Sequence, residues 1–152
     1  MTIVASARIK QALAEQWGRR EVARVELKLP IPPSVNALYR NRSSVELERA
    51  RNAGKPLRGR AKTDRYRTWL QGAGAALNEQ KPGRVAGPYN LTILIPRKQS
   101  RADVSNLEKA TSDLLQTHGV IDNDRLAETI FIQRVDWGGE MLVTVAAERR
   151  AA

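Results

Sequence analysis

The sequence of 152 residues contains no cysteine, a single histidine and few aromatic residues, which make up 5% of the chain. Without cysteine, disulfide bonds and thiolate zinc sites are excluded. With one histidine, a serine or cysteine nucleophile of the triad type is not expected. We expect His118, late in a predicted helix, to be half-buried or to cap the last carbonyls. Aliphatic side chains must fill most of one modest core.

Long hydrophobic segments are also missing from the sequence. No apolar run approaches the roughly 20 residues that cross a bilayer, and the N-terminus lacks the apolar core of a signal peptide, so we expect a cytoplasmic protein. Acidic residues are in the minority, because 26 Lys and Arg against 16 Asp and Glu give a net charge of +10. This charge favours a polyanionic partner, nucleic acid first and an anionic membrane surface second.

Hydrophobic periodicity predicts strands and helices that alternate within one domain. From 22 to 30, Val25, Leu27 and Leu29 alternate with polar residues, and the residues at 136–139 indicate a hairpin between the last two strands. Strands are predicted at 22–30, 88–96, 126–135 and 141–147, and helices at 5–20, 63–80 and 103–118.

A long basic segment follows the first strand. Gly54, Pro56 and Gly59 interrupt any helix there, so 42–60 is predicted to be a long flexible loop, which in a compact domain is either functional or merely solvated. A loop of this charge would suit a phosphate backbone. Between 40 and 67, three acidic residues stand against ten basic ones: Arg40, Arg42, Arg49, Arg51, Lys55, Arg58, Arg60, Lys62, Arg65 and Arg67.

A helix is predicted from Asp103 to a glycine at 119, because apolar residues recur there at helical spacing. Ser100 with Asp103, and Ser105 with Glu108, have the spacing of capping boxes at its start. The inward face is formed by Val104, Leu107, Thr111, Leu114, Leu115 and His118, and the polar residues on another face are Asn106, Lys109, Asp113 and Gln116.

Acidic residues flank this helix at both ends. Asp103 lies at its start, and Asp122 and Asp124 lie in the turn that follows. A helix of about 15 residues is about 22 Å long, so Asp103 and Asp124 can meet only if the chain turns back after Gly119. We expect the strand at 126–135 to make that return.

Two interpretations of these acidic residues follow from their chemistry. Carboxylate oxygens suit Mg²⁺, which can promote phosphodiester hydrolysis, and Lys109 could stabilise charge on a phosphate. Alternatively, Asp103 caps the helix, Asp113 pairs with Lys109 at i, i+4, and the late aspartates only shape a turn. Spacing alone leaves both interpretations open.

Three blocks of the sequence resemble the RusA-type Holliday junction resolvases, small endodeoxyribonucleases of bacteria and their phages. The blocks are PPSVN followed by YR at 32–40, Lys62 with Tyr66 and Trp69, and DVSNLEKATSDLLQTHGVIDND at 103–124. The third block is the most specific. The resemblance implies an α/β (α+β) fold in which a mixed β-sheet of about four strands packs with two main helices. The expected domain spans 22–148, with a helical extension at 1–21 and a tail at 149–152.

The resemblance also implies an activity and its residues. RusA-type enzymes are homodimers that make Mg²⁺-dependent, symmetrically paired nicks across a four-way DNA junction in recombination and repair, with Mn²⁺ as an alternative ion. A two-fold dimer suits a junction that presents two equivalent strands. By position, Asp103 and Asp124 would be metal ligands and Lys109 the catalytic cation. Asn106 matches a supporting position, and Asp113 matches a recurrent helix acid.

Two positions depart from the RusA pattern. Ser105 stands where the family has a second early aspartate, and Asn123 stands in the late acidic pair, with Asp122 displaced by one. Serine is neutral and a weaker Mg²⁺ ligand than a carboxylate. Either Asp122 or Asp113 compensates as a ligand, or the chain is a junction-binding protein that keeps the resolvase fold and cuts poorly. A basic structural module without preference for branched DNA is a third possibility.

Basic residues near the blocks are expected to contact the branched DNA, with the protein associated with the nucleoid while it acts. They lie in the predicted loop, at the start of the following helix and just before the acidic block. The candidates are Arg40, Arg42, Arg58, Arg60, Lys62, Arg65, Arg97, Lys98 and Arg101.

Overall fold

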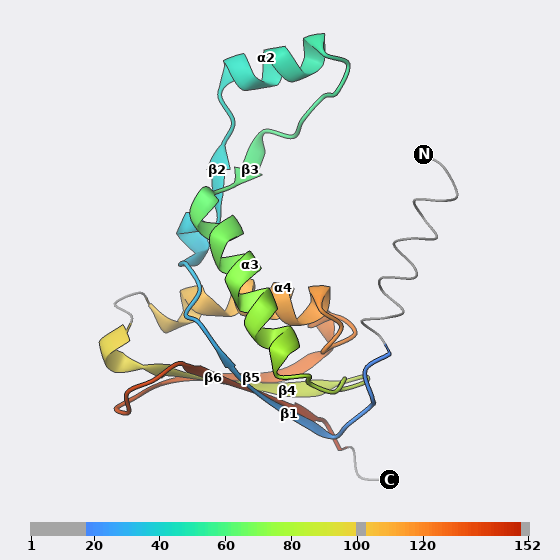
Figure 1. Ribbon diagram of the computed structural model, residues 1–152, viewed down its shortest axis with the longest axis vertical. Helices are drawn as coiled ribbons and strands as arrows, with labels where there is room; N and C mark the ends of the chain where they lie inside the picture. Colours follow the sequence, from blue (N-terminus) through green and yellow to red (C-terminus); the bar gives the residue numbers. More distant parts are fainter. Residues whose placement is uncertain (1–17, 100–102, 150–152) are drawn as a thin grey trace.

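The structure is a computed structural model that describes residues 18–99 and 103–149 (Figure 1). Most of the predicted helix at 5–20 lies outside these residues. So do Ser100, with its predicted capping box, and Arg101.

Four strands form a mixed sheet in the order β1-β6-β4-β5. β6 (Met141–Ala147) pairs antiparallel with β1 (Arg24–Leu29) and β4 (Tyr89–Pro96), and β5 (Ala127–Val135) pairs parallel with β4. All four strands lie where the sequence predicts them. The predicted hairpin is wrong, because β4 lies between β5 and β6. The residues at 136–139 reverse the chain without pairing the strands they join.

A parallel pair needs a crossover connection, and the segment between β4 and β5 provides it. This segment contains α4 (Glu108–Thr117) and three short 3-10 helices: η2 (Arg97–Gln99), η3 (Val104–Leu107) and η4 (Asp124–Leu126). Gly119 has a φ of 70°, which glycine adopts without steric cost, and the helix ends before it as predicted. β5 contacts η3, so the chain returns past the start of the segment as expected, but Asp124 stands before β5 begins and is not carried back with it.

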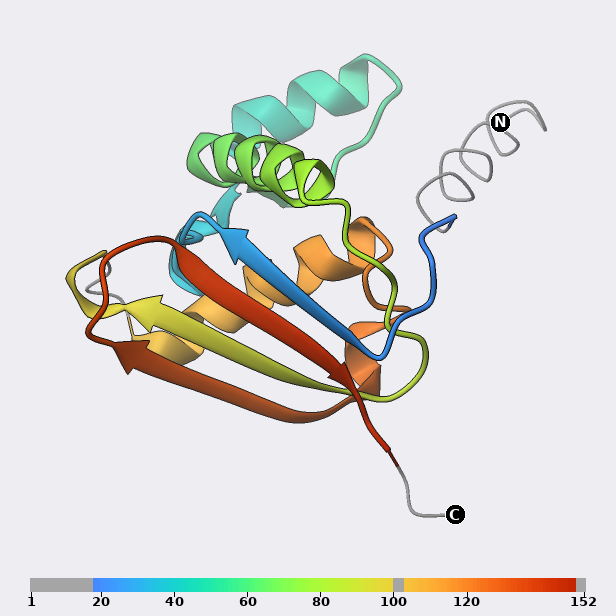
Figure 2. The ribbon, with the colours of Figure 1, turned by 60° about the horizontal axis from the view of Figure 1, so that its bottom comes forward.

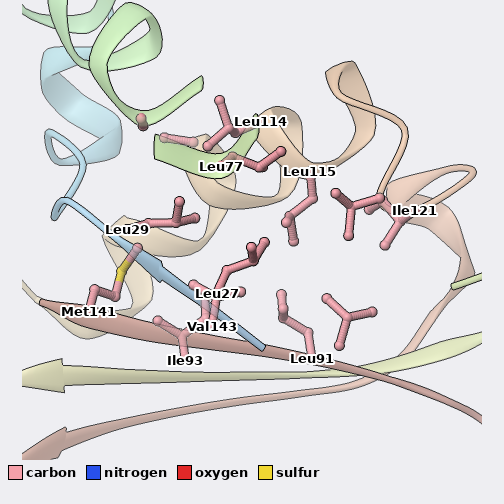
Figure 3. Packing of buried hydrophobic residues seen from close by; sticks show 14 of the residues in the cluster. Leu27, Leu29, Leu77, Leu91, Ile93, Leu114, Leu115, Ile121, Met141 and Val143 are labelled. Carbon is pink, nitrogen blue, oxygen red and sulfur yellow. The ribbon is translucent and has the colours of Figure 1, made fainter. Parts of the chain in front are cut away.

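The core lies between the sheet and two helices that cover the same face of it, α3 (Asp64–Glu79) and α4 (Figure 2). Alternate residues of the strands point into this layer, and Leu27, Leu91 and Ile93 are buried there. They face Leu77 of α3 and Leu114 of α4 (Figure 3). The core is mainly aliphatic, as the shortage of aromatic residues predicts.

The segment 42–60 is not the predicted loop but part of an arm, residues 39–62. In the arm, α2 (Ser44–Asn52) is connected to the body by an antiparallel pair, β2 (Tyr39–Asn41) and β3 (Arg60–Lys62), and projects away from the sheet (Figure 1). Ser43 and Glu46 form a capping box that starts the helix. Gly54, Pro56 and Gly59 do interrupt helical structure, but α2 fits into the nine residues before them.

The described residues form one mixed α+β domain with three α-helices, a four-stranded mixed sheet and a two-stranded sheet. The predicted fold class is therefore confirmed, with α2 as an addition to the two expected helices. Within the described ranges, no helix combines the length and the apolar character needed to cross a membrane.

Candidate functional site

The exposed face of α4 presents a lysine and an aspartate. Leu107, Leu114 and Leu115 are buried as predicted, so they fix which face of the helix points outward. On that outer face, Lys109 Nζ lies 3.0 Å from Asp113 Oδ1. This is the predicted i, i+4 pair.

Asp124 reaches the same lysine from the turn after the helix. Its Oδ2 lies 3.8 Å from Lys109 Nζ. Two contacts fix its backbone: the Asp124 N–H donates to Gln116 Oε1 at 2.9 Å, and the Tyr89 hydroxyl donates to the Asp124 carbonyl at 3.4 Å. Sequence patterns gave no role to Gln116 or Tyr89, because neither contact is visible as a local spacing.

Lys109 is held in its charged form by its neighbours. The hydrogen bond to Asp113 raises the pKa of Lys109, and the charges of Asp113, Asp124 and Glu108 act in the same direction. Burial raises the pKa of Tyr89 to about 12, so its hydroxyl stays protonated as a donor to Asp124. The result is a cation held between two carboxylates. The cation can contact a phosphate, and the carboxylates can help to hold a metal ion.

These residues belong to a segment that a known family shares. The family model described as Endodeoxyribonuclease RusA matches residues 16–146, most of the chain. The chain belongs to the RusA endodeoxyribonuclease family. RusA proteins act on Holliday junction DNA and generally depend on a divalent metal, so membership implies Holliday junction resolvase nuclease activity. No curated protein matches the chain.

The early part of the block at 103–124 is a 3-10 turn. Asp103 is the N-cap residue of η3, but only its carbonyl takes part, accepting from the Asn106 N–H at 3.0 Å, and its carboxylate makes no capping bond. The predicted capping box of Ser105 with Glu108 is wrong, because α4 begins only at Glu108. The Glu108 carboxylate accepts instead from the Ser112 hydroxyl.

The late part of the block at 103–124 contains two residues with structural contacts. Asp122 pairs with the Arg84 guanidinium and accepts from the Gly87 N–H at 3.0 Å. Asn123 caps η4 by accepting from the Arg125 N–H at 2.9 Å. Asp124 is therefore the member of this group that faces Lys109.

The donor set fits a divalent ion that completes its shell with water and substrate. Within 18–99 and 103–149, no group of three or more His, Cys, Asp or Glu side chains is placed to hold a metal. Mg²⁺ commonly binds one or two protein carboxylates together with substrate phosphate and keeps several waters. Asp124 supplies such a carboxylate beside Lys109. The described contacts do not bring Asp103 to the same place: Asp103 follows the end of β4, whereas Asp124 precedes β5, which starts beside the start of β4, and no described hydrogen bond or ion pair joins Asp103 to Lys109 or Asp124.

Most of the predicted DNA-binding residues lie on the arm or at its base. The Arg60 guanidinium lies 5.7 Å from the ring centre of Tyr39, and Lys62 Nζ lies 5.9 Å from that of Tyr66. These two cations thus flank the aromatic residues where the arm joins the body. Of the remaining members, Arg58, Arg65 and Lys98 are exposed and Arg42 is partly buried.

Two further DNA-binding candidates form ion pairs in the free protein. Arg40 binds both oxygens of Glu46 at 2.9 and 3.1 Å, and Arg97 Nε binds Asp136 at 2.9 Å. The single contact of Arg97 is an exposed ion pair of the kind that contributes little stability, so Arg97 can exchange a carboxylate for a phosphate at small cost. The pair of Arg40 is bidentate and also supports α2 through Glu46.

His118 is half-buried, as expected from the sequence, and has structural contacts. It packs on α3 at Gly74, where a Cβ would lie only 2.8 Å from its Nε2. Burial, with the nearby charge of Arg19, lowers the pKa of His118, so its ring is neutral at physiological pH.

Proposed function

We propose that the chain is a Mg²⁺-dependent endonuclease that resolves four-way DNA junctions by paired, symmetric nicks as a homodimer, with its nuclease domain at 22–148. The observation that supports this most is the meeting of Lys109 with Asp113 and Asp124 inside the segment matched by the RusA family. A helix and a separate turn place these groups together, and the basic arm lies in the same chain for DNA contact.

Each side chain has a distinct role in this proposal. Asp103 and Asp124 hold Mg²⁺ with water and phosphate oxygens, and Asp113 orients Lys109 through their 3.0 Å hydrogen bond. When bound, the ion activates water and stabilises the leaving oxygen. Lys109 balances the charge that develops on the scissile phosphate.

The test is incubation of the purified protein with a labelled four-way junction, in Mg²⁺ and in EDTA. We expect symmetric paired nicks that require Mg²⁺ and are lost in Asp103→Asn and Asp124→Asn. A junction that is bound but stays intact in Mg²⁺ would contradict the proposed nuclease activity. Equal binding of junction and linear duplex would leave only a basic α+β domain, and salt dependence cannot separate these cases because every basic DNA binder shows it.

Ser105 supports a second candidate, a junction-binding protein that cuts poorly. Its hydroxyl is neutral where the family has a carboxylate, and Asp122, which would have to replace that carboxylate as a ligand, is committed to Arg84 and Gly87. In this case Ser105→Asp should lower the Mg²⁺ concentration needed for nicking and raise the rate at limiting Mg²⁺, whereas the control Ser105→Ala should not. If Ser105→Asp changes neither quantity, the serine does not limit catalysis.

A further inference from the structure

A pocket of about 300 Å³ adjoins the candidate catalytic residues, and the nuclease chemistry proposed above does not use it. Its walls come from the base of the arm, from α3 and from the C-terminal half of α4. Asp113 and Gln116 belong to both the pocket and the site, since Asp113 binds Lys109 and Gln116 binds the Asp124 N–H. An occupant of this pocket would therefore lie beside the phosphate that Lys109 contacts.

The size and the aromatic wall of the pocket suit a single flat ring. The volume is at the small end of the range of about 300–1,000 Å³ for ligand pockets, which excludes a duplex. Tyr39 is 36% exposed although it lines the pocket, and its ring meets Tyr66 edge to face at 5.9 Å. An exposed aromatic ring is a surface on which any nucleobase can stack.

Two polar groups of the pocket, the Tyr66 hydroxyl and the Gln116 amide nitrogen, are available to a base. Tyr66 is 2% exposed and lines the pocket, and no described residue forms a hydrogen bond with its hydroxyl, so the hydroxyl is available to an occupant of the pocket. Burial raises the pKa of Tyr66 to about 12, so this hydroxyl remains a donor. Gln116 uses its carbonyl oxygen for Asp124 and retains its amide nitrogen as a donor. Lys62 brings a cation to the same wall for the adjoining phosphate.

We propose that this pocket receives one unstacked nucleobase of the junction strand, next to the scissile phosphate, and thereby aligns that strand for nicking. The inference rests on the proposed nuclease function, because a nucleic-acid substrate is what places a base there. Removing a base from the stack costs least where pairing is already disturbed, and the branch point of a junction is such a place. Tyr39 is then the stacking residue and Tyr66 a hydrogen-bond donor to the base.

The experiment combines protein variants with four-way junctions that lack a single base. Each nucleotide on either side of the cut is made abasic in turn, and a junction with an abasic site far from the cut serves as the substrate control. The variants are Tyr39→Leu, which removes the ring from a strand without buried residues, and Tyr39→Phe, which keeps it. Trp137→Leu removes an exposed aromatic residue outside the pocket and is the matched control. Thermal unfolding verifies that each variant is folded.

We expect the wild-type protein to nick one flanking abasic junction about tenfold more slowly than the intact one, the effect of one stacked base. Tyr39→Leu should slow nicking of the intact junction by a similar factor but nicking of the abasic junction much less. Tyr39→Phe and Trp137→Leu should keep the wild-type preference for the intact junction. Equal rates on intact and abasic junctions, or an equal effect of Tyr39→Leu on both, would overturn the pocket.

A protein that nicks no junction contradicts the proposed function, and the pocket is then judged by binding in EDTA. In that case the wild type should bind the flanking abasic junction more weakly than the intact one, and Tyr39→Leu should bind both alike. Equal wild-type affinity for the two junctions would overturn the base-binding pocket as well.

Discussion

At the scale of single residues, Lys109 connects α4 to the turn that carries Asp124. We expect Lys109→Gln to slow nicking by about a hundredfold or more, because a positioned charge is lost from the transition state. Junction affinity in EDTA should change little, since we expect many other basic residues to contact phosphate. Gel assays of nicking and binding measure both. Lys28→Gln, an exposed position on β1, is the control, and wild-type nicking by Lys109→Gln would remove Lys109 from the mechanism.

Asp122 is predicted to stabilise the fold and not to hold the metal. Arg84 Nε is buried without a hydrogen-bond partner, so its guanidinium depends on the Asp122 carboxylate. We expect Asp122→Asn to lower the free energy of unfolding by about 1–2 kcal/mol without raising the Mg²⁺ concentration for half-maximal nicking. Chemical denaturation and Mg²⁺ titration measure these quantities. Asp124→Asn is the comparison, and an equal rise in Mg²⁺ requirement for both variants would make Asp122 a ligand.

At the scale of elements, segments with a strong local pattern could be predicted from the sequence. Alternation places Val25, Leu27 and Leu29 of β1 in the core, and helical spacing gives the buried face of α3. Ser43 and Glu46 have the local spacing of a capping box, a helix signal that was not used in predicting 42–60, whereas Gly54, Pro56 and Gly59 favour a loop. β2 and β3 were missed because each has three residues and their pairing is non-local.

The contacts of the candidate site also divide into local ones, which the sequence predicts, and non-local ones, which it does not. The Lys109 and Asp113 pair follows from helical spacing alone, and the structure contains it. The approach of Asp124 depends on the left-handed turn at Gly119 and on contacts from Gln116 and Tyr89, which no spacing rule predicts. For the same reason, the sequence did not predict that Asp122 would be occupied by Arg84 of a distant segment.

The helix of the arm is predicted to depend on one glutamate. α2 has nine residues and buries none of them, and helices shorter than about 12–15 residues are marginal in water. Glu46 binds Arg40 and closes the capping box with Ser43. We expect Glu46→Ala to speed amide hydrogen exchange throughout α2 and to weaken junction binding, with little effect on global thermal unfolding. Glu48→Ala on the same helix is the control, and unchanged exchange in Glu46→Ala would contradict this role.

The same glutamate gives the arm a defined pH dependence. The hydrogen bond from Arg40, followed by that from the Ser43 N–H, lowers the pKa of Glu46 from 4.5 to about 2. Its contribution to helix stability is therefore complete above pH 4.5 and is lost as the pH falls towards 2. Protection factors of α2 amides should fall over this range in the wild type. They should fall less in Glu46→Gln, which keeps the capping geometry without the titrating charge.

At the scale of the whole molecule, the sheet is covered by helices on one face and open on the other (Figure 2). Phe131 of β5 pairs in register with Thr92 of β4, so it lies on the open face, opposite to Leu91 and Ile93. Phe131 is 54% exposed and its neighbour Ile130 is 47% exposed. β5 is also an edge strand, and its outer side pairs with no other strand of the described chain. An exposed apolar edge is suited to pairing with another chain.

A junction with two equivalent strands needs two sites related by a two-fold axis, and one chain provides one. We expect two chains to associate through β5 and Phe131→Glu to convert the dimer into a monomer, because a buried charge opposes association. Sedimentation measures the mass, and a plasmid cruciform separates paired nicks, which give linear DNA, from single nicks, which give open circles. Leu57→Glu, at an exposed apolar residue of the arm, should stay dimeric. A dimeric Phe131→Glu variant would place the interface elsewhere, and linear product from a monomeric wild type would show that paired cleavage does not require the dimer.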